Sequence, residues 1–303
     1  MNRRSFLAAG ITAAGAAVCS RLAGSAADTR LPLPTDARVV PLHALRRLIV
    51  ERVDPIAGRC RYVADLGASR VAQPILIARR GERLDAVIEN SLPQPTTVHV
   101  HGLTLPEAED GAGFDPIAPG ARKMIRFELR NRAGLYWFHP HPHGFTAEQV
   151  HAGLAGLLVV VDEEDAALDA ALALAPANRL ALALADVRVA GGALRPYSPT
   201  ADECLHGWFG NRVQVNGTLD ARYAVAPGWV RLQLLNACNA RGLLLAFRDG
   251  ESAVPFHLLG TDGGLLSAPI ELERAFVYSA ERVDIAINAA GRRELAAVSV
   301  EFD

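Results

Sequence analysis

Short runs of apolar residues, either continuous or alternating with polar ones, dominate this chain, and glycines and prolines separate them. Such runs are typical of β-strands, because successive side chains of a strand point to opposite faces. Many of them, joined by turns, predict an antiparallel sandwich or barrel. In the first half of the chain we expect strands at 48–53, 75–78, 84–90, 98–103, 123–129, 135–139 and 156–161.

A segment of different composition divides this strand-rich chain into two blocks. Residues 162–165 are all acidic and alanines follow as far as residue 177, which predicts an exposed linker with a short helix. In the second block we expect strands at 179–187, 212–215, 229–235, 243–247, 256–259, 275–278 and 283–287. Because the two blocks share length and period, we expect an all-β protein with two domains, at 28–161 and 179–303, joined by a linker at 162–178.

The first 27 residues have the features of an export signal. Arg3 and Arg4 precede an apolar run at 8–18, and small residues follow at 25–27. This order predicts a twin-arginine signal peptide over residues 1–27 and a periplasmic location for the mature protein. The apolar run is too short for a membrane anchor, because a helix needs roughly 20 apolar residues to span a bilayer.

The charge balance argues against two classes of partner. Loss of Arg3, Arg4 and Arg21 with the signal peptide lowers the number of basic residues from 31 to 28 against 33 acidic ones, a formal net charge of −5. Nucleic acids and anionic membranes attract basic surfaces. We therefore expect neither nucleic acid nor membrane among the partners.

Two pairs of histidines stand in predicted strands. His99 and His101 are separated by one residue, as are His139 and His141, so each pair faces one side of its strand. Four imidazoles that converge from neighbouring strands favour a borderline-soft transition metal, with copper and zinc as the leading candidates. By the same alternation His143 faces the site. The alternatives are a structural cluster of hydrogen-bonded histidines and a scaffold that has lost its metal.

Several segments around and beyond these histidines form an ordered set of motifs. Three of them, at 97–103, 134–144 and 149–156, are similar to motifs of the first cupredoxin domain of bacterial multicopper oxidases. Four more, at 215–217, 231–241, 260–264 and 280–284, are similar to motifs of that family's middle domain. The chain thus resembles the first two domains of the periplasmic, three-domain, laccase-like type. This resemblance implies two cupredoxin-like Greek-key β-sandwiches.

The resemblance also implies copper as the cofactor and gives the paired histidines distinct roles. His99 resembles the ligand of the mononuclear copper in the family's trinuclear copper site. His101, His139 and His141 resemble ligands of the coupled copper pair in that site. The first domain would therefore carry half of a trinuclear site.

The family's parent chemistry is one-electron oxidation of phenols or metal ions, coupled to the reduction of oxygen to water. Asp110 matches an acidic position that assists proton delivery during oxygen reduction, and a solvated loop acid is the equal alternative. His143 matches a residue that orients a copper ligand without binding copper itself.

The sequence departs from the family at the site of electron entry. A blue copper site needs a cysteine, two histidines and usually a weak axial methionine. None of Cys60, Cys204 and Cys238 is flanked by histidines, and Met124 is the only methionine after the first residue. We therefore expect a chain without the third, blue-copper domain, which binds copper but does not turn over alone. The three cysteines allow at most one internal disulfide, whose pairing stays open.

On this interpretation the chain is an incomplete oxidase. Its partners would be O2, a small phenolic or metal-ion reductant, and a separate polypeptide that carries the third domain. Two alternatives belong to other classes: a periplasmic copper-binding protein, and a non-catalytic scaffold like the family's cell-division relatives. The four retained histidines speak against the scaffold, and the missing third-domain motifs speak against an autonomous oxidase.

Overall fold

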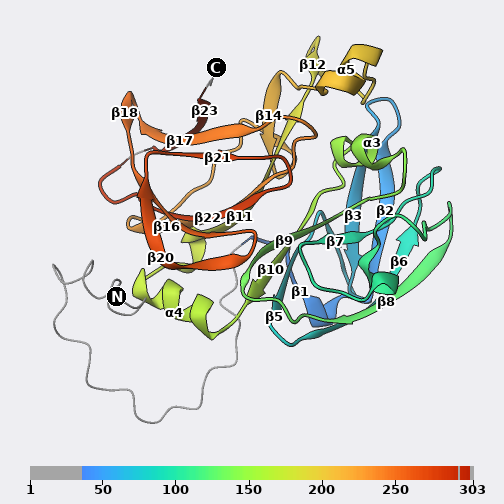
Figure 1. The fold of residues 1–303 in the computed structure, drawn as a ribbon, viewed down its shortest axis with the longest axis horizontal. Helices are drawn as coiled ribbons and strands as arrows, with labels where there is room; N and C mark the ends of the chain where they lie inside the picture. Colours follow the sequence, from blue (N-terminus) through green and yellow to red (C-terminus); the bar gives the residue numbers. More distant parts are fainter. Residues whose placement is uncertain (1–35, 293, 301–303) are drawn as a thin grey trace.

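The computed structural model describes residues 36–292 and 294–300. These residues form two β-sandwiches that lie side by side, with the linker helix beneath the second of them (Figure 1). The predicted all-β class is confirmed. The expected signal peptide at 1–27 lies outside the described residues.

The first sandwich consists of two five-stranded sheets. One contains, in spatial order, β1 (Val39–Pro41), β5 (Ile75–Arg79), β10 (Gly156–Val161), β9 (Gly134–His139) and β7 (His99–His101). The other contains β4 (Arg70–Ala72), β3 (Arg59–Asp65), β2 (Arg47–Asp54), β6 (Arg83–Asn90) and β8 (Arg122–Glu128). Their inner faces share one apolar core, in which the rings of Tyr62 and Phe138 lie 4.9 Å apart between centroids.

The second sandwich is built from a large sheet and a smaller one. The large sheet contains β15 (Thr218–Leu219), β14 (Arg212–Val215), β11 (Arg179–Val187), β16 (Trp229–Asn236), β22 (Arg282–Asn288), β19 (Phe256–Thr261) and β20 (Gly264–Leu272). The smaller one contains β18 (Ser252–Ala253), β17 (Leu243–Asp249), β21 (Arg274–Val277) and β23 (Ala296–Val300). Phe247, Phe256 and Ile285 are among the buried residues of the core between them.

Strand direction differs from the antiparallel sandwich that the sequence predicts. β5 runs parallel to both β1 and β10, β2 runs parallel to β6, and β11 runs parallel to β16. Parallel neighbours require a connection that crosses over, whereas a hairpin joins only antiparallel strands. Between β1 and β5, between β5 and β10 and between β2 and β6 the chain passes through the opposite sheet. Between β11 and β16 it forms a separate small hairpin and then two strands of the same sheet, β14 and β15.

Short helices and one small hairpin complete the described structure. They are η1 (Leu42–Ala44), α2 (Glu107–Asp110), α3 (Thr146–His151), α4 (Glu163–Ala171), η2 (Pro176–Asn178), α5 (Ala201–His206), and the pair β12 (Val189–Ala190) and β13 (Ala193–Leu194). The helix expected in the linker is α4, whose first turn is capped by the Asp162 carboxylate. No helix among the described residues is long and apolar enough to cross a membrane.

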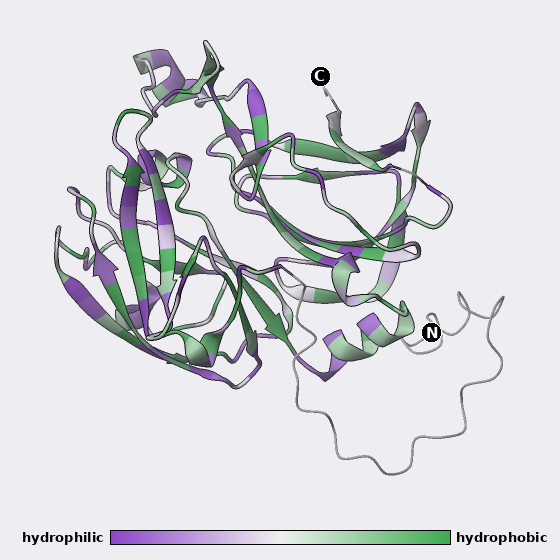
Figure 2. Cartoon of the chain, turned by 180° about the vertical axis from the view of Figure 1, so that it is seen from behind, coloured by the Kyte–Doolittle hydropathy of each residue, from purple (hydrophilic) through white to green (hydrophobic). Residues whose placement is uncertain are grey.

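The two sandwiches pack together through apolar strands. Figure 2 shows hydrophobic residues along the strands of both sandwiches, and one buried cluster joins β5, β9 and β10 of the first to β11 and β16 of the second. Trp137 and Leu157 of the first sandwich lie in this cluster with Ala183 and Leu235 of the second. Burial of this shared surface holds the two sandwiches in one arrangement.

A buried network of charges fixes the linker helix to the second sandwich. Arg231 is fully buried and makes ion pairs with Asp165 and Asp169 of α4 and with Asp284 of β22. Arg179 pairs with the same two helix residues. Asp165 and Asp169 lie one helical turn apart, so both carboxylates face the sheet.

Candidate metal centre

The register between β7 and β9 brings the histidines together. The edge strand β7 pairs antiparallel with β9, with His99 opposite His139 and His101 opposite Trp137. Directly opposed residues of a pair of strands project from the same face of the sheet. Both histidines of β7 therefore lie on one face with His139 and Trp137, whose rings stack at 4.0 Å between centroids.

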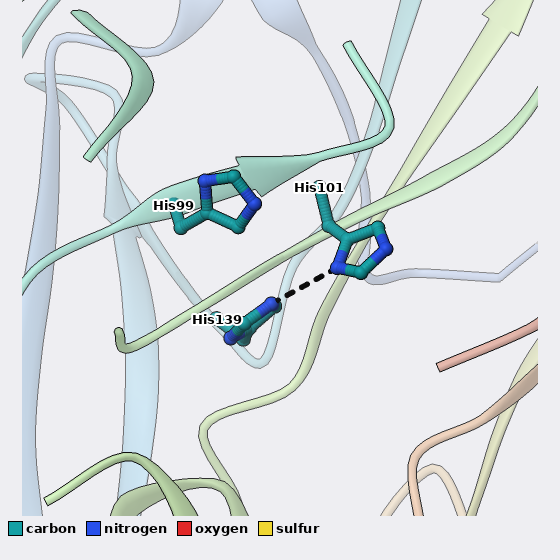
Figure 3. A group of neighbouring side chains, drawn as sticks. All are labelled: His99, His101 and His139. Carbon is teal, nitrogen blue, oxygen red and sulfur yellow. Dashed lines mark hydrogen bonds between the residues drawn. The ribbon is translucent and has the colours of Figure 1, made fainter. Parts of the chain in front are cut away.

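Three of the imidazoles form a compact group. One ring nitrogen from each of His99, His101 and His139 lies within 4.8 Å of the others. Figure 3 shows the three rings turned toward one another, with Nδ1 of His101 3.2 Å from Nε2 of His139. His139 is 5 % exposed, while His99 and His101 are partly exposed. The group is therefore reached from solvent on the side of β7.

Hydrogen bonds behind the rings set which nitrogens face the group. Nδ1 of His139 lies 2.8 Å from the carbonyl oxygen of Pro140, and Nδ1 of His99 lies 2.9 Å from the carbonyl oxygen of Asp110. A carbonyl oxygen only accepts, so each Nδ1 carries a proton and each Nε2 has an unprotonated lone pair. Such outer hydrogen bonds orient metal-ligating histidines and raise their basicity.

The environment keeps the inner imidazoles neutral. Burial lowers the pKa of His139 to about 3, against the opposing effect of its hydrogen bond to Pro140. Burial also lowers the pKa of His101 to about 4, and the nearby positive charge of Arg282 adds to the effect. Neutral imidazole is the form that binds a metal ion, so both rings are ready as ligands near neutral pH.

The second sandwich closes one side of the site through Arg282, whose side chain is 3 % exposed. Its guanidinium donates to the carbonyl oxygens of Leu135 and Ala280 and pairs with Asp262 at 2.8 Å. Gly102, directly after the second histidine, has a φ of +87°, and a Cβ there would lie 2.5 Å from Nη2 of Arg282. The turn after β7 therefore packs tightly against the second sandwich.

Asp110 lies beside the group. It ends α2, and its carboxylate Oδ2 is 3.1 Å from Nδ1 of His99, the same nitrogen that contacts its backbone carbonyl. The Asp110 side chain is 22 % exposed, so it contacts both the imidazole and solvent. This position suits a group that passes protons between water and the site.

The structure places His141 next to the compact group but not in it. β9 ends at His139, so His141 follows the strand, and its backbone N–H donates to Oγ1 of Thr97 at 2.8 Å. Its ring centroid lies 5.4 Å from that of His99 and 5.8 Å from that of His139. His141 is exposed and thus lies at the open edge of the site.

His143 departs from the prediction made by strand alternation. It lies four residues beyond the end of β9 in a turn, so the alternation does not extend to it. Its side chain is exposed, and no contact between it and the other site histidines is seen in the described part of the chain.

Sequence reasoning missed the parts that Trp137 and Arg282 play at this site. From the sequence, Trp137 is most simply interpreted as an aromatic residue of the core. In the structure its ring stacks on that of His139 and lies 5.3 Å from that of His101 between centroids. Arg282 belongs to the motif at 280–284, which signalled the family but not a contact with the first domain. Its hydrogen bond to Leu135 spans 147 positions of the chain.

The cysteines lie outside this group. Cys60 and Cys238 are buried and Cys204 is exposed, and all three are free thiols. No disulfide therefore joins the cysteines that the structure describes. The group of side chains that could hold a metal ion, among the residues that the structure describes, contains histidines only.

The donor set fits copper. Three imidazoles with converging nitrogens, two of them oriented by carbonyl oxygens, suit a borderline-soft ion such as copper, whereas a hard ion prefers oxygen ligands. Nδ1 of His101 and Nε2 of His139 are held at hydrogen-bond distance. Because the Nε2 of His139 is unprotonated, Nδ1 of His101 donates the proton in this contact. Both nitrogens would be ligands for a copper ion once the His101 ring carries its proton on Nε2 instead.

Comparisons with known proteins identify the family of the chain. The sequence profile of the family described as "Multicopper oxidase" matches residues 67–165, which include all four paired histidines. A protein of Staphylococcus aureus named "Multicopper oxidase mco" is 33 % identical over 73 % of this chain and 47 % of its own length. The "Cell division protein FtsP" of Photorhabdus laumondii is 31 % identical over 75 % of this chain and 47 % of its own length.

Solved structures extend the likeness to both sandwiches. A variant of the McoA multicopper oxidase of Aquifex aeolicus matches with a TM-score of 0.73 and 28 % identity, over 84 % of this chain and 56 % of that one. A multicopper oxidase of Campylobacter jejuni, described as a metallo-oxidase, matches with a TM-score of 0.70 and 29 % identity, over 89 % and 56 %. The chain spans about half the length of these relatives. Its two sandwiches have the cupredoxin fold, and the chain belongs to the multicopper oxidase family.

Proposed function

We propose that this chain binds copper through His99, His101 and His139, with His141 as a further ligand at the open edge. The observation that carries the proposal is the convergence of three imidazole nitrogens within 4.8 Å of one another. On this proposal the first sandwich supplies half of a trinuclear copper site, in an oxidase that couples one-electron oxidation of a substrate to reduction of O2 to water.

The side chains around the site have separate tasks in this proposal. Copper, when bound, supplies one-electron redox chemistry. His99 and His139 keep their protons on Nδ1 and present Nε2, because carbonyl oxygens accept those protons. Asp110 exchanges protons between solvent and the vicinity of His99, since its carboxylate contacts both. Oxygen reduction consumes protons, so such a carboxylate acts as a general acid.

Electron entry requires ligands that are not found in the 303 residues. A blue copper site needs a cysteine close to two histidines, and none of Cys60, Cys204 and Cys238 is flanked by histidines. We therefore propose that a further domain or a separate polypeptide completes the oxidase, and that a small phenol or a metal ion is its reductant. The twin arginines Arg3 and Arg4 support export to the periplasm.

A second candidate function rests on the relatives named for cell division. The identity to FtsP of Photorhabdus laumondii, at 31 %, is close to the identity to the Staphylococcus aureus oxidase, at 33 %. On this candidate the two sandwiches act as a scaffold without copper chemistry. The two candidates differ in one measurable property, because only the first requires copper to bind at the histidines.

The test is a copper titration of the full chain against a chelating competitor. We expect binding that the double substitution His101→Ala and His141→Ala largely abolishes. His257→Ala serves as the control, because His257 lies in β19 of the other sandwich, next to Trp229. Equal copper affinity in the double variant and the wild type would contradict the proposal and favour the scaffold.

Oxygen consumption with a phenolic reductant separates copper binding from turnover. The copper-loaded chain alone is expected to consume oxygen no faster than free copper, because it has no route for electron entry. Sustained turnover by the chain alone would show that electrons enter through other ligands. Cys204 and His206 of α5 are then the first residues to test.

A further inference from the structure

A cleft lies where the two sandwiches meet, apart from the histidine site. Strands β5 and β10 of the first sandwich and β11 and β14 of the second line it, and the space in it that water can occupy is about 40 Å³. Ile75 and Leu157 provide an apolar wall on one side. Ala183 and Ala185 stand on the other side, and their short side chains leave the space between the sandwiches unfilled.

Two polar side chains in this cleft have unused hydrogen-bonding capacity. Gln214 is 4 % exposed, and its Oε1 has no hydrogen-bond partner. Arg59 is partly buried, and within the described residues its guanidinium makes one long hydrogen bond, 3.4 Å from Nη1 to the carbonyl oxygen of His151. Burial lowers the pKa of Arg59, and the opposing effects of Cys60 and of the Asp54 carboxylate compensate this only in part. A buried acceptor and an unpaired cation are both costly unless a ligand satisfies them.

The other polar side chains of the cleft are already used. Gln73 and Asn216 each accept from a backbone N–H and donate to a backbone carbonyl. Arg38 is paired with Asp36. Among the described side chains that line the cleft, a ligand therefore finds one cation without an ion pair, at Arg59, and one acceptor without a partner, at Gln214.

We propose that this cleft binds a small hydroxycarboxylate with a short aliphatic chain. Its carboxylate pairs with Arg59, its hydroxyl donates to Oε1 of Gln214, and its carbon chain lies against Ile75 and Leu157. Arg59 belongs to the first sandwich and Gln214 to the second, so the ligand bridges the two and stabilises their packing. The proposal does not depend on copper binding.

The test is calorimetric titration of the copper-free full chain with 3-hydroxybutyrate. We expect one site, and weaker binding by about tenfold for butyrate, which lacks the hydroxyl, and for 1,3-butanediol, which lacks the carboxylate. Arg59→Met should weaken 3-hydroxybutyrate binding by about tenfold or more. Arg52→Met is the matched control, because Arg52 is exposed on the neighbouring strand β2 and does not line the cleft.

Two further variants locate the ligand. Gln214→Met should weaken binding of 3-hydroxybutyrate and leave that of butyrate unchanged, because only the hydroxyl contacts the amide. Ala185→Leu should abolish binding of both, since the larger side chain fills the cleft while Arg59 and Gln214 remain. Absence of 3-hydroxybutyrate binding to the wild type, or unchanged binding in Arg59→Met or in Ala185→Leu, would overturn the proposal.

Discussion

Nδ1 of His101 and Nε2 of His139 lie 3.2 Å apart, although 38 positions of sequence separate the two residues. The antiparallel register of β7 and β9 creates this proximity, because it sets His99 directly opposite His139. The carbonyl oxygen of Pro140 then holds the His139 ring with Nε2 toward His101. The metal-binding geometry is thus built into the strand pairing and one backbone hydrogen bond.

Asp110→Asn should weaken copper binding about tenfold. The carboxylate lies 3.1 Å from Nδ1 of His99 and increases the electron donation of that ring, while the backbone carbonyl still accepts the Nδ1 proton in the variant. Copper affinity is measured by competition with a chelator. Asp115→Asn is the control, because Asp115 is 81 % exposed and pairs with Lys123. An affinity loss of equal size in both variants would show that the effect is only one of net charge.

Gly102→Ala should lower the free energy of unfolding by about 1–3 kcal/mol, because the residue has a φ of +87° and its Cβ would lie 2.5 Å from Nη2 of Arg282. The Arg282 side chain is buried and tied to Asp262, so it has little freedom to move away. Urea unfolding measures the change. Gly120→Ala is a matched control, since Gly120 also has a positive φ, of +75°, but open space around it. Equal losses in the two variants would mean that Arg282 makes no tight contact there.

Asp165→Asn should destabilise the protein by about 3–5 kcal/mol at neutral pH. Asp165 is fully buried, and its removal leaves the positive charges of Arg231 and Arg179 incompletely compensated. Urea unfolding of both proteins checks the prediction. The exposed pair of Arg222 and Glu294 provides the control, because Glu294→Gln should change stability by less than about 1 kcal/mol.

The lowered pKa of Asp165 predicts that the stability of the protein depends on pH. Burial raises the pKa of Asp165, but the ion pairs with Arg231 and Arg179 outweigh it and leave the pKa below its ordinary value of 3.8. A carboxyl group whose pKa is lower in the folded state than in the unfolded state stabilises the folded protein at pH values above its unfolded-state pKa. This stabilisation is lost as the pH falls below that pKa. The stability gap between wild type and Asp165→Asn should therefore narrow below about pH 4. A gap that is constant down to pH 3 would contradict the ion-pair account.

Copper added to the chain should give no intense blue colour. That colour arises from a copper–thiolate bond, and burial raises the pKa of Cys60 and of Cys238, which keeps both as thiols. Cys204 is exposed on α5 but lies outside the histidine group. Absorption spectra of copper-loaded wild type and Cys204→Ser should coincide. An intense band that Cys204→Ser removes would identify a thiolate ligand.

Much of the fold follows from local sequence pattern. The strands predicted at 156–161, 179–187 and 212–215 have the same bounds in the structure, because apolar runs between turn residues mark both of their ends. Strand β3 was not predicted, since arginines at 59 and 61 interrupt its apolar residues. The parallel pairs were not predicted either, because pairing depends on contacts between distant segments and not on the period of one strand.

The candidate site, too, was predictable only as far as local sequence pattern determines it. Spacing alone placed His99 with His101 and His139 with His141 on one face of their strands, and the family resemblance added their roles as copper ligands. Spacing could not show that β9 ends at His139, which leaves His141 and His143 outside the strand alternation. The contact of Arg282 with the turn at Gly102 comes from packing between the two sandwiches, which no local pattern encodes.

The most direct test of copper binding by the histidines is pulsed electron paramagnetic resonance on the full chain with one equivalent of Cu(II), using protein with 15N-labelled histidine. Coupling of the copper electron to several 15N imidazole nuclei is the predicted result. His139→Ala should lose part of that coupling, while His257→Ala should retain it in full. Copper that shows no 15N-histidine coupling in the wild type, or the same coupling in His139→Ala, would contradict the account.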